Sequence, residues 1–202
     1  MEQQQTGKRS AALPITLILL VFSLIGNVFL YSQALQRQQD SKFETGKTIY
    51  EDAMTAGQFF EELSVQLDTL IQSRGMEERQ AALVMAGMAI QKRGSLLELA
   101  AAAKRLAPDG TKIDEEAFAS FAGKVDAIFL QPPGAYEGPL KDTDREKLNV
   151  LKEYADRMAE AVGGLNASIA DNRTALIRLA AGADWLDRVA KLQQLIGEYN
   201  AA

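Results

Sequence analysis

The stretch IYEDAMTAGQFFEELSVQLDTL, residues 49–70, decides the fold of this chain. Its apolar and small residues recur at alternating steps of four and three. These positions are Ile49, Ala53, Ala56, Phe60, Leu63, Leu67 and Leu70. The spacing puts them on one side of a helix, as in helices that pack against other helices. The stretch therefore predicts a helix whose apolar face is covered by neighbouring helices.

An uncharged apolar run precedes this helix. Residues 11–31, AALPITLILLVFSLIGNVFLY, contain no charge, and a helix of that length spans ~30 Å, the thickness of the bilayer hydrocarbon. Lys8 and Arg9 precede the run, and the positive-inside rule keeps such a tail in the cytoplasm. We therefore expect a cytoplasmic tail over residues 1–10, a transmembrane anchor over residues 11–33, and the main domain outside the cytoplasm.

A cleaved signal peptide is the alternative interpretation of this run. Ser32-Gln33-Ala34 is a suitable small-x-small cleavage site. The apolar run is longer than the roughly 7–15 residues of an ordinary signal-peptide core, which favours a retained signal-anchor. Both interpretations export the domain, and we expect it at the bacterial cytoplasmic membrane with the N-terminus inside.

The exported part is expected to contain a polar stalk and then packed helices. The stalk covers residues 34–48, either continuing the helix or breaking before Ile49. Helical patterns cover residues 49–73, 76–106, 114–130 and 143–199. The predicted fold is all-α: a transmembrane helix followed, over residues 49–202, by an antiparallel helical bundle of three to five helices with coiled-coil-like seams. The expected seam residues include Phe60, Leu63, Leu67, Phe118, Phe121, Leu165, Ile169 and Leu176. A homodimeric coiled coil is the alternative.

Three local features refine this expectation. Gly87 and Gly94 recur seven residues apart, and small residues on a seam predict close approach of two helix backbones. Thr143 with Glu146 predicts a capping box at the start of the last segment, and Thr111 or Asp114 predicts a cap at the start of the third. A kink or break is expected between residues 163 and 173, because an unbroken last helix would be ~85 Å long.

The composition lowers the expectation of catalysis. The chain has no cysteine and no histidine, so thiol chemistry, thiolate zinc sites and imidazole proton transfer are absent. Beyond residue 31 there are 20 Lys and Arg against 26 Asp and Glu, a balance that disfavours nucleic acid. No catalytic residue, metal site or cofactor is predicted.

Two aromatic residues are candidate partner contacts. Tyr136 lies in the proline-stiffened connector PPGAYEGP, and Trp185, the only tryptophan, lies in ADWLDRV. Aromatic side chains often anchor partner proteins. A plain connector for Tyr136 and a core position for Trp185 are the alternatives.

The order of several motifs resembles a known family. After the anchor come EEAFASFAGKV at 115–125, GPLKDTDREKLNVLKEYA at 138–155 and DWLDRV at 184–189. This order resembles the N-terminal helical part of the YpeB family of spore-germination proteins, from the anchor to about Val189. The resemblance implies a non-catalytic protein that localises or stabilises a lytic enzyme of the cell wall. That family continues into a region of small α/β repeats that residues 1–202 do not contain, so no functional residue is carried across.

These observations predict a non-enzymatic interaction or scaffolding protein of the bacterial envelope, with a role in sporulation or germination. The expected partners are the lipid bilayer and an envelope protein, with a cell-wall hydrolase as one candidate and a second copy of the chain as another. The alternative function is a sensory or ligand-binding bundle that works with a separate signalling partner. An enzyme that uses carboxylates alone is the third class.

Overall fold

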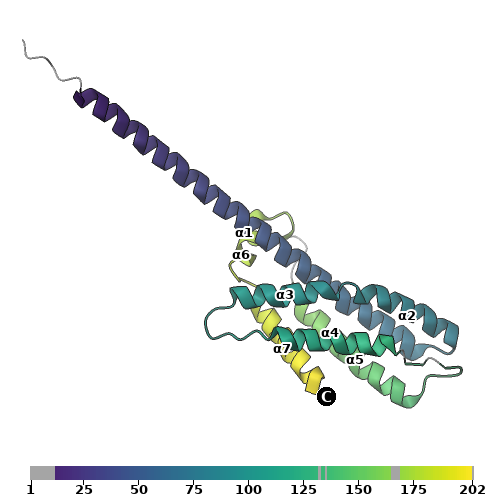
Figure 1. Ribbon diagram of the computed structural model, residues 1–202. Coiled ribbons are helices and arrows are strands. Elements are labelled where there is room, and N and C mark those ends of the chain that lie inside the picture. Colours follow the sequence, from purple (N-terminus) through teal and green to yellow (C-terminus); the bar gives the residue numbers. More distant parts are fainter. Residues whose placement is uncertain (1–11, 132, 135, 165–168, 202) are drawn as a thin grey trace, which may run out of the picture. The chain divides into compact units, whose positions relative to one another are not determined.

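The computed structural model describes residues 12–131, 133, 134, 136–164 and 169–201. In these residues it contains seven α-helices and no β-strand, so the predicted all-α class is confirmed (Figure 1). The helices are α1 (Ala12–Gln72), α2 (Met76–Ile90), α3 (Arg93–Leu106), α4 (Glu115–Leu130), α5 (Asp142–Val162), α6 (Arg173–Leu179) and α7 (Leu186–Ala201). The chain divides into an N-terminal unit, Met1–Ser41, and a C-terminal unit, Lys42–Ala202. The expected cytoplasmic tail, residues 1–10, lies outside the described residues.

The N-terminal unit contains the apolar run. Large apolar side chains between Ile15 and Tyr31 are 45–68% exposed, so no side of the helix is a core face there. By length and composition, α1 is the one helix of the described residues that could cross a membrane. Pro14 lies in its first turn, where a missing N–H leaves no hydrogen bond unmade.

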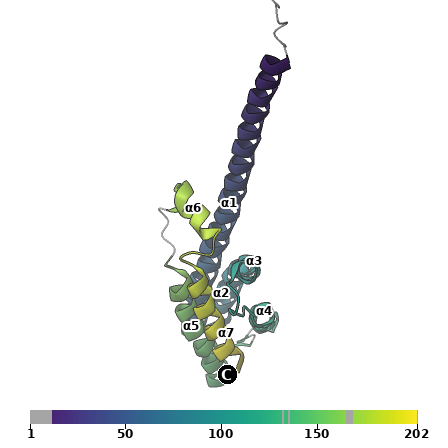
Figure 2. The same ribbon diagram turned by 90° about the vertical axis from the view of Figure 1, so that its left-hand side faces the viewer.

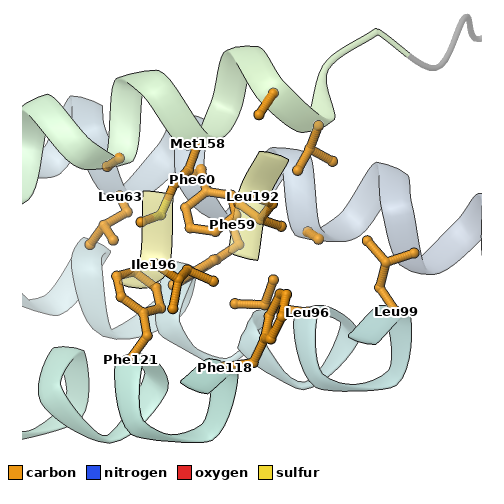
Figure 3. Close-up of a cluster of buried hydrophobic side chains, with 14 of the residues drawn as sticks. Phe59, Phe60, Leu63, Leu96, Leu99, Phe118, Phe121, Met158, Leu192 and Ile196 are labelled. Carbon is orange, nitrogen blue, oxygen red and sulfur yellow. The ribbon is translucent and has the colours of Figure 1, made fainter. Parts of the chain in front are cut away.

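The C-terminal unit is built around one cluster of buried apolar side chains. Side chains from α1, α3, α4, α5 and α7 converge in it (Figure 3). They include Phe59, Phe60, Leu63, Leu96, Leu99, Phe118, Phe121, Met158, Leu192 and Ile196. Helix α7 packs against α5 and α4, and α3 packs against α4 (Figure 2). Each such side chain contributes about 1.5–3 kcal/mol when fully buried, before entropy costs.

The stalk is helical throughout. Helix α1 continues without interruption through Gly46 to Gln72, and the C-terminal unit already includes Lys42. The side chain of Phe43 is half-buried and packs against the core. The guanidinium carbon of Arg173, at the start of α6, lies 4.8 Å from the centre of its ring.

The expected helix over residues 76–106 is divided in the structure. Helix α2 ends at Ile90 and α3 begins at Arg93. The close approach predicted at Gly87 and Gly94 is wrong, because a Cβ at either glycine would meet no atom within 4 Å. The buried residues of α2 are instead Arg79, Ala82, Ala86, Ala89 and Ile90.

The helix starts differ in part from their predictions. Asp114 caps α4, accepting hydrogen bonds from the N–H groups of Glu116 (3.1 Å) and Ala117 (3.3 Å), so the second of the two predicted caps is the one formed. The capping box predicted at Thr143 is wrong. Helix α5 already begins at Asp142 after Lys141, and no side chain caps it.

The predicted break between residues 163 and 173 is confirmed. Helix α5 ends at Val162, and the side chain of Asn172 accepts a hydrogen bond from the N–H of Ala175 (3.1 Å) at the start of α6. A second interruption was not predicted. It lies between α6 and α7, where Gly182 and Asp184 both have positive φ, +83° and +72°.

Candidate interaction surface

Helix α2 has two apolar faces. The inner face is buried and consists of Arg79, Ala82, Ala86, Ala89 and Ile90, and Leu83 is half-buried against the core. The outer face carries larger side chains that remain exposed: Val84 (68%), Met85 (50%) and Met88 (58%). We call these three residues the methionine face. Met88 follows Met85 by three residues and Val84 by four, which places it next to both on the helix.

A groove runs beside the methionine face within the C-terminal unit. It has a volume of about 570 Å³. Its lining comes from α1, α2, the turn after α2, and α3: Thr55, Glu62, Gln66, Met85, Met88, Gln91, Lys92 and Ser95. Lys92 forms an ion pair with Glu62 across the groove. The groove therefore combines the thioether side chains of α2 with a polar wall from α1.

One end of the groove is acidic. Asp52 of α1 interacts with Ser95, which lines the groove, and with the negative charge of Glu98 on α3. Burial raises the pKa of Asp52 above its ordinary value of 3.8, and Glu98 raises it further, although the hydrogen bond with Ser95 acts in the opposite direction. The carboxylates of Asp52 and Glu98 thus repel one another beside Ser95, at one end of the groove.

Tyr136, one of the two candidate partner contacts, is half-buried in the connector between α4 and α5. Its hydroxyl donates a hydrogen bond to Asp144 Oδ2 (2.8 Å) and accepts one from the N–H of Lys141 (2.7 Å). The ammonium of Lys141 lies 4.4 Å from the centre of its ring. Because its polar group and its ring face are both engaged within the chain, we do not carry Tyr136 forward as a partner contact.

The same connector surrounds a buried cation, Arg79 of α2, which is 1% exposed. Its Nε donates to the carbonyl of Gly134 (2.9 Å), and its Nη2 donates to the carbonyls of Tyr136 (2.6 Å) and Gly138 (2.8 Å). Its Nη1 is buried with no hydrogen-bond partner among the described residues. Arg79 therefore ties the connector to α2.

The burial of Arg79 could have been predicted from its position in the sequence, although a charged residue is not normally expected in a core. Arg79 precedes Ala82 and Ala86 by three and seven residues, so it lies on the inner stripe of α2. A connector with two glycines and three prolines leaves carbonyls free of helical hydrogen bonds. An arginine fork is well suited to several carbonyls at once.

Trp185, the other candidate contact, is buried. Its indole N–H donates to the carbonyl of Leu179 (2.9 Å), which closes the turn between α6 and α7. This position agrees with the core alternative. A buried ring offers no surface to a partner, so Trp185 is not part of the candidate site.

Seven of the eight expected seam residues lie in or against the core of the C-terminal unit. Six of them have fully buried side chains, with 0% exposure: Phe60, Leu63, Leu67, Phe118, Phe121 and Leu176. Ile169 is half-buried and packs against the same cluster. Leu165 lies outside the described residues.

A second groove lies between α4, α5 and the end of α7. Its volume is about 620 Å³. It is lined by Lys124, Ala127, Ile128, Thr143, Glu146, Lys147, Val150 and Tyr199. Burial raises the pKa of Tyr199, whose ring packs edge-on against Phe121 and Tyr154.

Within the described part of the chain, no group of three or more Asp and Glu residues is placed to hold a metal ion. The buried polar side chains there are Ser64, Ser73 and Arg79.

Comparison with known proteins adds no relative. No family model matches the chain, and neither a curated protein nor a solved structure matches it. The resemblance to the YpeB family therefore stays an expectation.

Proposed function

We propose that this chain is a membrane-anchored, non-catalytic protein-interaction module whose partner docks on the methionine face. In this proposal the first part of α1 is the transmembrane anchor. Residues 42–202 form an antiparallel helical bundle with coiled-coil-like seams, held on the outer side of the bacterial cytoplasmic membrane. The shared core of the C-terminal unit supports the bundle.

The observation that carries the proposal is the contiguous group of large exposed apolar side chains on α2. A helix that only packed inward would bury its larger apolar side chains, because buried apolar area stabilises by about 25 cal/mol per Å². Helix α2 buries Ile90 and half-buries Leu83 beside its alanines, but Val84, Met85 and Met88 are exposed. Isolated exposed apolar residues are ordinary, but a contiguous group beside a groove is typical of a protein interface. Methionine is also frequent where a surface adapts to a partner helix.

The anchor supports the membrane location. Its apolar side chains are exposed all round in the structure, and lipid would cover them. Lys8 and Arg9 before the run support an inside N-terminus. The resemblance to the YpeB family supports a role in germination, with a cell-wall hydrolase as the class of partner.

Photo-crosslinking tests the proposal. The full chain, carrying a photoreactive phenylalanine analogue at Met88, is expressed in the source cell and irradiated in its membranes. We expect one specific protein adduct from this position. The matched control is Leu130 at the end of α4, which is 81% exposed and should not give that adduct. Adducts with lipid or with the chain itself alone, or the same adducts from both positions, would contradict the proposal.

The groove between α4, α5 and α7 favours a second candidate function, the sensory or ligand-binding bundle. Its volume of about 620 Å³ lies within the range of small-molecule sites, roughly 300–1,000 Å³. Filling it with Val150→Trp should abolish the thermal stabilisation that a true ligand gives. A ligand that stabilises this variant as much as the wild type would exclude the groove as its site.

A further inference from the structure

Acidic side chains lie near both ends of the methionine face. Glu77 is seven and eleven residues before Val84 and Met88, which places it on the same stripe of α2 at the N-terminal end. Asp52 and Glu98 lie beside the other end of the groove, next to Ser95. Both Glu77 and Glu98 are exposed.

The basic side chain of this groove is already engaged. Lys92 forms its ion pair with Glu62, and both residues line the groove. This leaves Glu77 at one end and the Asp52–Glu98 pair at the other, with an apolar centre between them. The charge pattern is thus acidic, apolar, acidic from the start of α2, which is ~22 Å long, to the Asp52–Glu98 pair of α1 and α3 beyond its end.

The charges argue against a second copy of this chain as the occupant. A two-fold dimer places the same surface patch of each protomer against the other. In a parallel pairing Glu77 would meet Glu77, and in an antiparallel pairing Glu77 would meet Asp52 and Glu98. Like charges would face each other in either case, which costs binding free energy.

Resting on the function proposed above, we infer that the methionine face binds an amphipathic helix of a partner protein that carries Lys or Arg at both ends of its apolar stripe. The stripe packs on Val84, Met85 and Met88. The basic ends meet Glu77 on one side and Asp52 and Glu98 on the other. Such a helix-in-groove mode obtains affinity from the apolar anchors and orientation from the charges.

Synthetic helices test this inference on the full chain in nanodiscs of zwitterionic lipid. The first peptide has a leucine stripe and two lysines at each end. The second has glutamates in place of those lysines, and the third has the composition of the first in scrambled order. Fluorescence anisotropy measures binding, and empty nanodiscs correct for binding to lipid. We expect the lysine-ended peptide to bind at least ~10-fold more tightly than the other two, a difference of 1.4 kcal/mol.

Variants locate the binding site. Met88→Glu should weaken binding of the lysine-ended peptide by at least ~10-fold, because the substitution puts a charge among the apolar anchors. Leu130→Glu, an equally polar change at another exposed apolar position, should leave binding unchanged. The double variant Glu77→Lys with Glu98→Lys should reverse the preference, so that the glutamate-ended peptide binds more tightly. Circular dichroism confirms that each variant is folded.

Four outcomes overturn the inference: equal binding of the two charged peptides, no binding of either, loss of binding in Leu130→Glu rather than Met88→Glu, or a dimer of the chain that Met88→Glu dissociates. The proposed function can survive such a result. If position 88 still crosslinks to one specific protein in membranes, the face is an interface but its ligand is not a basic helix. If neither a peptide nor a protein binds at the methionine face, the inference and the proposed function both fail.

Discussion

The Cα of Gly46 lies directly against the backbone carbonyl of Leu176. A Cβ built on Gly46 would be 1.8 Å from the Leu176 oxygen and 2.5 Å from its carbonyl carbon. These atoms belong to the backbone, so rotation of a side chain cannot relieve the overlap. Gly46 therefore allows α6 to rest on the backbone of α1 within the C-terminal unit.

We predict that Gly46→Ala destabilises the protein by about 1–3 kcal/mol, the usual cost of overpacking. Gly57→Ala is the matched control on the same helix, since its Cβ would lie 3.8 Å from Val162 Cγ1, an ordinary contact. Alanine at position 57 should be neutral or stabilising by ~0.5–1 kcal/mol through helix propensity. Thermal melts followed by circular dichroism measure both. Equal melting temperatures for the two variants would show that α6 does not lie against Gly46.

Arg79 holds the connector between α4 and α5 through three backbone carbonyls. Replacing it with Met keeps much of the volume and leaves those carbonyls without a donor, so we predict a loss of roughly 3 kcal/mol. The stability of Arg79→Lys should lie between those of Arg79→Met and the wild type, because an ammonium group lacks the planar fork of a guanidinium. Arg105→Met, at an exposed position of α3, should change stability by less than about 0.5 kcal/mol. Chemical denaturation of the four proteins measures the order, and an Arg79→Met variant as stable as Arg105→Met would refute the role.

The carboxyls of Asp52 and Asp156 should make contributions to the stability of the protein that change with pH in opposite directions. The pKa of Asp52 is raised by burial and by Glu98. A carboxyl of this kind contributes stability below the ordinary pKa of 3.8, and that contribution is lost as the pH rises through the raised folded value. Asp52→Asn should therefore raise the melting temperature at pH 7, with a gain that shrinks toward pH 3.

Burial tends to raise the pKa of Asp156, but hydrogen bonds from Ser64 and Lys152 outweigh it and lower the pKa below 3.8. Its contribution to stability is present above pH 3.8 and disappears as the pH falls through the lowered folded value. Asp156→Asn should lower the melting temperature at pH 7 and converge with the wild type in acid. Melts of both variants between pH 3 and pH 7 provide the comparison. Changes of the same sign at pH 7 would contradict this assignment.

The proposed membrane anchor can be tested by introducing charge into the centre of the apolar run. Leu20→Arg with Leu24→Arg adds an apparent insertion cost of about 2.5–3.5 kcal/mol for each arginine. We predict that the variant moves from the membrane pellet to the soluble fraction after alkaline carbonate extraction. Gln38→Arg with Gln39→Arg, beyond the apolar run, should remain in the pellet. Retention of the first variant in the pellet would mean that the run does not span the membrane.

Much of the fold was predictable, because the helix seam at residues 49–70 and the turn residues near 163–173 are local signals. The division of the second helix was less visible, since no proline or glycine pair marks Gln91 and Lys92. Helix α2 is apolar on nearly every side, so its periodicity could not show that the alanines are inside and the methionines outside. The contact between Gly46 and Leu176 joins residues far apart in sequence, and no local pattern predicts it.

Cysteine labelling in intact cells tests the central claim that a partner covers the methionine face outside the cytoplasm. The chain has no cysteine of its own, so Met88→Cys and the exposed control Glu153→Cys each supply one thiol. With a membrane-impermeant maleimide, we predict that the thiol at position 153 reacts in intact cells. The thiol at position 88 should be protected there and should react readily in the purified protein. Equal reaction at both positions in intact cells would contradict a bound partner, and no reaction at position 153 until the cells are opened would contradict export.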